Sequence, residues 1–76
     1  MVIGGVVIKV HPDERKDIEI ILSRYHEVSV YGSDEKGNII ATITSDNSVS
    51  MKDIIKTIEK HGSVMGVSLA YLNTGR

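Results

Sequence analysis

Histidines are the residues of this chain best suited to acid–base or metal chemistry, and their spacing argues against both. His11, His26 and His61 are separated by whole predicted elements of secondary structure. The sequence has no cysteine and no HExxH pattern, so no pair of metal ligands is set at a known spacing. We therefore expect no metal site and no catalytic histidine.

The glycine-containing segment GGVVIK, residues 4–9, is the other place to look for chemistry, because glycine loops can hold phosphate groups. It contains neither GxGxxG nor GxxxxGK. An acylphosphatase-like enzyme would need an arginine in an anion-binding loop after the first strand, whereas Arg15 in KVHPDER lies inside an acidic helix start. Gly4 and Gly5 instead suggest that another group approaches the strand closely. We expect no enzyme activity.

Size and composition limit the remaining classes. A chain of 76 residues has room for one core, so we expect a single domain over residues 1–76. The formal net charge of −1, with mixed signs, argues against nucleic acid or an anionic membrane as the partner. The longest apolar run, MVIGGVVI, is too short to span a bilayer and does not resemble a secretory signal. A cytoplasmic location is expected.

Hydrophobic periodicity predicts strands alternating with helices. Alternating apolar residues predict strands over residues 2–10, 27–32, 38–44 and 64–72. Helical spacing gives one apolar stripe in each of two helices, over residues 12–25 and 45–62. We expect Ser48 or Ser50 to cap the second helix and Gly62 to end it. The stripes are Ile18, Ile21, Leu22 and Tyr25, and Met51, Ile54, Ile55 and Ile58.

This order, βαβ followed by βαβ, predicts an α+β fold of the ferredoxin-like type. With right-handed crossovers, the four antiparallel strands take the order 4-1-3-2. Since each helix has a single apolar stripe, both helices must cover the same side of the sheet. The other side is expected to remain open.

The open side is unusually smooth for a solvated sheet. Only Lys9 among its predicted residues is charged, which favours a platform for another molecule's apolar surface. The preference of β-branched residues for strands, or a dimer interface, would account for the same pattern. The predicted residues are Gly5, Val7, Lys9, Ser29, Tyr31, Ile40, Thr42, Thr44, Gly66, Ser68, Ala70 and Leu72. The acids Glu27, Asp34 and Glu35 are expected near one rim, where cationic side chains of a peptide would settle.

Three segments, in this order and spacing, resemble the NapD family, the assembly chaperones of periplasmic nitrate reductase. They are VVIKVHPDE, EVSVYGSDEKGNIIATI and IIKTIEKHGSVMGVSLAYLN. The resemblance implies a chaperone without a cofactor that binds the twin-arginine signal peptide of the catalytic subunit precursor. It also implies that export is delayed until the molybdenum cofactor is inserted.

On this interpretation the signal peptide binds the open face of the sheet. Val7, Tyr31, Ile40, Ala70 and Leu72 would make apolar contacts beside Thr42, while Gly5, Gly66 and Ser68 permit close approach. Glu27, Asp34 and Glu35 are the candidates for binding the arginines. The alternative is a small-molecule-binding regulatory module that acts as a dimer.

Overall fold

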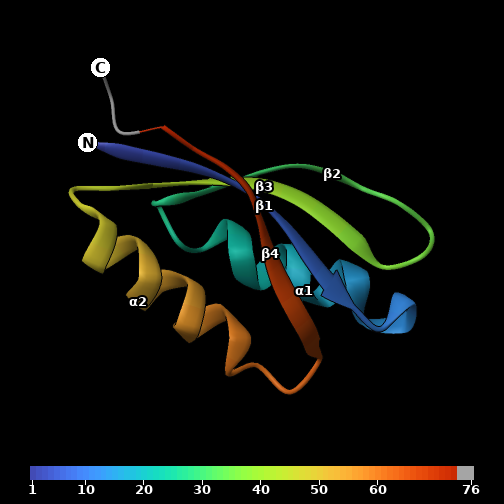
Figure 1. Ribbon diagram of the computed structural model, residues 1–76. Helices are drawn as coiled ribbons and strands as arrows, with labels where there is room; N and C mark the ends of the chain where they lie inside the picture. The colour runs from blue at the N-terminus through green and yellow to red at the C-terminus, as the bar shows by residue number, and fades with distance from the viewer. Residues whose placement is uncertain (74–76) are drawn as a thin grey trace.

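The computed structural model of the chain describes residues 1–73, which form one four-stranded antiparallel sheet and its helices (Figure 1). The strand order is β2-β3-β1-β4, which is the predicted order read from the other edge. The predicted ferredoxin-like fold is therefore confirmed. In chain order the elements are β1 (Val2–Val10), a 3-10 turn (Pro12–Glu14), α1 (Arg15–Ser23), β2 (Val28–Ser33), β3 (Asn38–Ser45), α2 (Ser48–Glu59) and β4 (Val64–Asn73).

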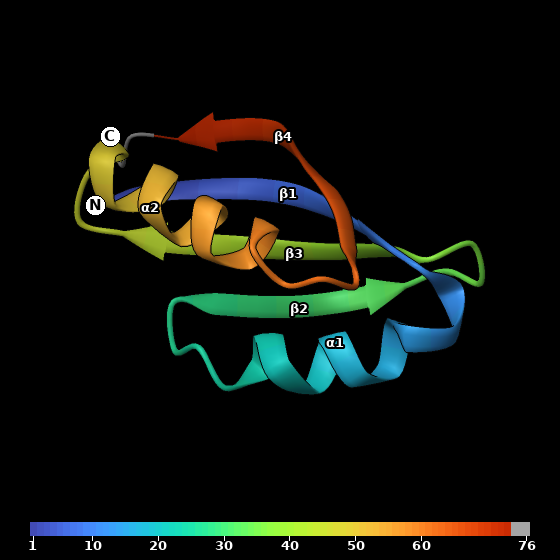
Figure 2. The same ribbon diagram turned by 90° about the horizontal axis from the view of Figure 1, so that it is seen from below.

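Both helices lie on the same side of the sheet. Figure 1 shows α1 and α2 below the strands, and Figure 2, viewed from below, shows α2 in front of β1 and β3 and α1 alongside β2. Among residues 1–73, no element covers the opposite face. The sheet is therefore covered by helices on one side only, as the single apolar stripe of each helix predicted.

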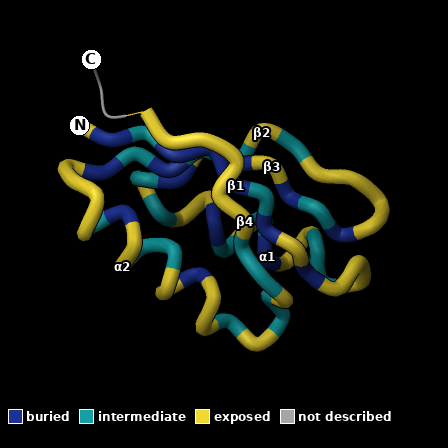
Figure 3. Tube along the Cα trace, viewed as in Figure 1, coloured by how far each residue is buried: buried dark blue, intermediate teal, exposed yellow. Residues whose placement is uncertain are grey.

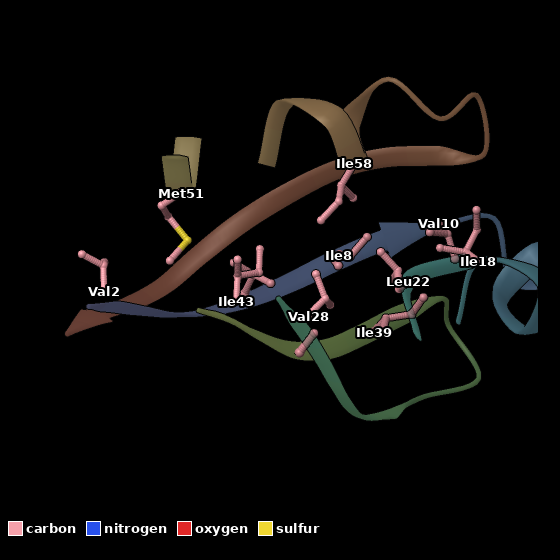
Figure 4. Packing of buried hydrophobic residues seen from close by; sticks show 12 residues of the cluster. Val2, Ile8, Val10, Ile18, Leu22, Val28, Ile39, Ile43, Met51 and Ile58 are labelled. Atoms are coloured by element: carbon pink, nitrogen blue, oxygen red, sulfur yellow. The ribbon is translucent and has the colours of Figure 1, made fainter. Parts of the chain in front are cut away.

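The core lies between the helices and the central strands β1 and β3 (Figure 4). Alternate residues of these strands are buried, including Val6 and Ile8 in β1 and Ile39 and Ile43 in β3. Each helix contributes two buried residues of its stripe: Ile18 and Leu22 from α1, and Met51 and Ile58 from α2. The core leaves little room for a side chain at Gly4, since a Cβ atom there would lie 3.2 Å from Leu69 Cδ1 and 3.3 Å from Met51 Sδ.

The ends of α2 differ from the sequence prediction. The cap is Asn47, whose side-chain oxygen accepts a hydrogen bond from the Ser50 N–H at 2.9 Å. Neither Ser48 nor Ser50 holds the capping position. The helix ends at Glu59, with Lys60 as its C-cap, and Gly62 has no positive φ. The helix therefore stops without the left-handed glycine that the sequence suggested.

The turn between β2 and β3 joins the hairpin to the end of β1. Gly37 has a φ of 94° and its carbonyl oxygen accepts a hydrogen bond from the Val10 N–H at 2.8 Å. A Cβ atom on residue 37 would overlap the Val10 carbonyl oxygen. Glycine is required here both by the backbone conformation and by the space available.

We expect Gly37→Ala to destabilise the fold by about 1–3 kcal/mol, the usual cost of forcing a non-glycine residue into such a conformation. Chemical denaturation with circular dichroism measures the change. Gly62→Ala is the matched control, because a Cβ at Gly62 meets nothing within 4 Å and its φ is not positive. Equal stability losses in the two variants would contradict the structural role of Gly37.

Candidate functional site

The register of the central strands determines which residues share the open face. Residues directly opposite each other in antiparallel strands point to the same side of a sheet. Gly5 is opposite Thr42, and Val7 is opposite Ile40. These four residues alternate with buried core residues such as Val6 and Ala41, so they lie on the face away from the helices.

A shallow apolar pocket of about 240 Å³ occupies the middle of this face. It crosses all four strands. Six of the nine residues predicted to bind a peptide line it: Gly5, Val7, Tyr31, Ile40, Thr42 and Ala70. The remaining lining residues are Val6, Ala41 and Tyr71.

Tyr71 is the pocket residue that the sequence prediction missed, and Leu72 was placed on the wrong face. The register between β1 and β4 shifts at Gly5/Val6, so that Leu69 is opposite Val6 while Tyr71 is opposite Gly5. Ala70 is the extra residue of this β-bulge, and it reverses the alternation for the rest of the strand. Leu72 lies opposite Gly4, on the helix side.

The ring of Tyr71 lies over Gly5, where a Cβ atom would overlap it. The space that was expected to admit a bound molecule is thus filled by the protein's own tyrosine. A glycine inside a strand often marks a bulge or a close contact, so Gly5 was the available sequence signal for this arrangement.

Tyr31 also owes its position to a β-bulge, in this case in the other outer strand, β2. A register shift between Val30 and Gly32 makes Tyr31 the extra residue of a bulge, and its side chain is 73% exposed. Two exposed tyrosines, one on β2 and one on β4, therefore flank the pocket.

The other predicted face residues lie beyond the pocket. Ser68 is opposite Val7 and Gly66 is opposite Lys9, so both share the open face. Lys9 is exposed, as predicted for the one charged residue of this face. It lies near the end of the sheet where β1 finishes and β3 begins.

The three candidate acids do not gather at one end of the sheet. Glu27 directly precedes β2, whereas Asp34 and Glu35 directly follow it, so they lie at opposite ends of that strand. Glu27 Oε1 is 3.4 Å from His26 Nδ1. Glu35 lines a surface hollow that also contains Arg15 and Lys36, so cations already accompany it.

The Asp34 carboxylate accepts hydrogen bonds from residues of its own turn. Oδ1 accepts hydrogen bonds from the Lys36 N–H at 2.9 Å and the Asn38 N–H at 3.0 Å, while Oδ2 accepts one from Asn38 Nδ2 at 2.9 Å. These bonds, chiefly that of the Asn38 side chain, lower the pKa of Asp34 below its usual value. Asp34 is therefore a structural residue of the hairpin.

Glu27 has an acidic neighbour that sequence reasoning did not identify. Asp46 and Glu27 line a hollow of about 360 Å³ at the end of the sheet where β2 begins and β3 finishes, beside the start of α2. Its other lining residues are Met1, His26, Thr44, Ser45, Ser50 and Ile54. Nothing in the local sequence pairs these two acids, because 18 residues separate them and only the hairpin brings them together.

Comparison with known proteins assigns the chain to a family. Residues 1–75 match the family model described as NapD protein. The chain belongs to the NapD family. The fold is similar to the solution structure of the E. coli Tat proofreading chaperone protein NapD, with a TM-score of 0.84 and 21% identity. The match covers 97% of this chain and 78% of that one. No match was found among curated proteins.

Membership of the NapD family confirms the resemblance inferred from the strand and helix segments. Within residues 1–73, no group of three or more histidine, aspartate or glutamate residues is arranged to hold a metal ion. The helices of this region are also too short or too polar to cross a membrane.

We expect Asp34→Ala to lower the thermal stability of this NapD protein at neutral pH. Because the folded-state pKa lies below the unfolded value, the ionised carboxylate contributes stability above that unfolded value, and this contribution is lost as pH falls through the folded pKa. The difference in melting temperature between wild type and variant should therefore shrink below about pH 4. Thermal denaturation from pH 7 to pH 2.5 measures it.

Glu35→Ala is the control for removing a carboxylate from the same turn, since Glu35 is exposed. A difference between wild type and Asp34→Ala that stays constant across this pH range would contradict the role given to the carboxylate.

Proposed function

We propose that this protein is a cytoplasmic chaperone that binds the twin-arginine signal peptide of the periplasmic nitrate reductase catalytic subunit. Binding delays export of the precursor until its cofactor is inserted and folding is complete. The observation that carries the proposal is the apolar pocket on a sheet face that residues 1–73 leave uncovered, in a chain of the NapD family. A twin-arginine signal joins a basic stretch to an apolar one, and the apolar stretch needs such a surface.

The dimensions of the face suit a single helix lying along the strands. Tyr31 and Tyr71 are on the outer strands β2 and β4, separated by three strand spacings. At the usual 4.8 Å per spacing this is roughly 14 Å, and an α-helix with its side chains is about 10–12 Å wide. An extended peptide lying on the face would leave its backbone N–H and C=O groups without partners, whereas a helix satisfies them internally. The two tyrosines would then contact opposite sides of the helix.

The charges favour one direction for the bound peptide. Lys9, the charged residue of the open face, lies near the end of the sheet that is opposite Glu27 and Asp46. The arginine pair is repelled by Lys9 and attracted by the two acids. The basic stretch therefore lies at the end of the sheet where β2 begins, with the apolar stretch in the pocket.

We expect Ile40→Asp to weaken binding of a synthetic signal peptide by at least about tenfold, because Ile40 lines the pocket with 47% of its surface exposed and the peptide would desolvate the new carboxylate. The peptide should carry the two arginines and the apolar segment. Isothermal titration calorimetry gives the affinity. Amide chemical shifts of the wild type should change in the strands.

Ile20→Asp is the matched control, since Ile20 is an exposed isoleucine on α1, on the other side of the sheet. It should bind the peptide as the wild type does. Chemical-shift changes confined to α1 and α2, or equal losses in the two variants, would place the binding site elsewhere.

Glu27→Gln tests the direction of the peptide. An exposed ion pair is worth about 0.2–1 kcal/mol, so we expect affinity to fall by about 1.4- to 5-fold. Glu35→Gln removes an acid from the opposite end of β2 and should leave affinity unchanged. Repeating both titrations with lysines in place of the arginines distinguishes charge from guanidinium geometry. A larger loss in Glu35→Gln would reverse the direction.

A further inference from the structure

The outer edge of β4 is long, uncharged and unprotected. β4 has ten residues, Val64–Asn73, and none of them is charged or proline. It pairs only with β1 in the described sheet, and no element of residues 1–73 lies beyond it (Figure 2). Figure 3 shows exposed residues along its C-terminal half. Such an edge presents main-chain donors and acceptors to another strand.

The opposite edge of the sheet is protected in the ways that proteins commonly use. β2 has only six residues, against ten in β4, and acids adjoin both of its ends. Bulges do not distinguish the two edges, because the register shifts once between β2 and β3 and twice between β1 and β4. Short length and charges discourage strand addition. β4 is therefore the edge strand better suited to pairing with a strand of another molecule.

We infer that β4 pairs with β4 of a second copy of this chain, antiparallel, about a twofold axis through Ser68. The absence of charge in β4 favours a second copy, since the strand meets itself without like-charge repulsion. A basic signal peptide gains no charge attraction at this edge. The inference does not depend on the proposed function.

The position of the axis follows from the side chains. Ser68 is close to the middle of Val64–Asn73, so an axis there uses nearly the whole strand. It places Val67 opposite Leu69 of the second copy and Val64 opposite Leu72, and all four residues lie on the helix side. Leu69 and Leu72, which are 49% and 46% exposed, would each gain an apolar partner.

An axis one residue earlier, through Val67, fits less well. Leu72 would then face Gly62 and Tyr71 would face Ser63, both beyond the start of β4. An axis between two residues would pair side chains from opposite faces, which an axis perpendicular to the sheet does not allow. Pairing about Ser68 gives a continuous sheet of eight strands, with both pockets on the same side.

Sedimentation equilibrium tests the inference without any peptide. The wild-type mass should rise with concentration from 8.3 kDa towards twice that value. Ser68→Lys and Ser68→Glu each place like charges opposite each other at the axis, so each should weaken the dimer at least about fivefold. An equimolar mixture of the two variants should dimerise again, because Lys then faces Glu. Ile20→Lys, on α1, should dimerise as the wild type does.

A wild type that stays monomeric up to its solubility limit would overturn the inference. So would Ser68 variants that dimerise as tightly as the wild type, and a mixture that remains monomeric would overturn the axis at Ser68. Hydrogen exchange of the wild type at low and high concentration provides a test without variants, since only β4 amides should gain protection. If β4 is protected by added signal peptide and not by concentration, the edge binds an extended client and the inference is wrong.

Discussion

The structure depends on the fact that each helix can bury only one stripe of apolar side chains. Ile18 and Leu22 of α1, and Met51 and Ile58 of α2, contact the sheet from the same side and complete one core. Residues 1–73 contain no further element with which to build a second core. The other face of the sheet is left to water or to a partner, and its composition suits the partner, because Lys9 is the charged residue among small and apolar ones.

The central and outer strands have different parts in shaping that face. β1 and β3 alternate regularly, so they supply a flat base of which Val7, Ile40 and Thr42 are examples. The register shifts once in β2 and twice in β4, and the shifts at Tyr31 and Ala70 place Tyr31 and Tyr71 beside the base. Bulges bend and twist a strand locally. The regular strands β1 and β3 thus supply the apolar floor of the pocket, and the bulged strands β2 and β4 supply the tyrosines on its two sides.

Sequence patterns were sufficient for the fold because they are periodic. Alternation in β1 and β3 and helical spacing in α1 and α2 determine which side of each element is buried, and strand order follows from connection rules. Leu72 and Tyr71 were exchanged because a period of two assumes no bulge. Asp34 was predicted as an arginine-binding acid, but its carboxylate accepts three hydrogen bonds from groups whose positions only the folded turn defines. Glu27 and Asp46 are neighbours only through the hairpin.

β4 contributes both to the pocket and to the outer edge of the sheet, and this couples the two surfaces. The bulge at Ala70 directs Tyr71 over Gly5, while main-chain groups of the same strand that do not pair with β1 face its outer edge. A larger residue at Gly5 would displace the tyrosine ring and open the wall of the pocket. A strand paired to the outer edge would restrain the bulge and hold the ring in place. The position of Tyr71 therefore depends on its packing against β1 and on what lies beyond β4.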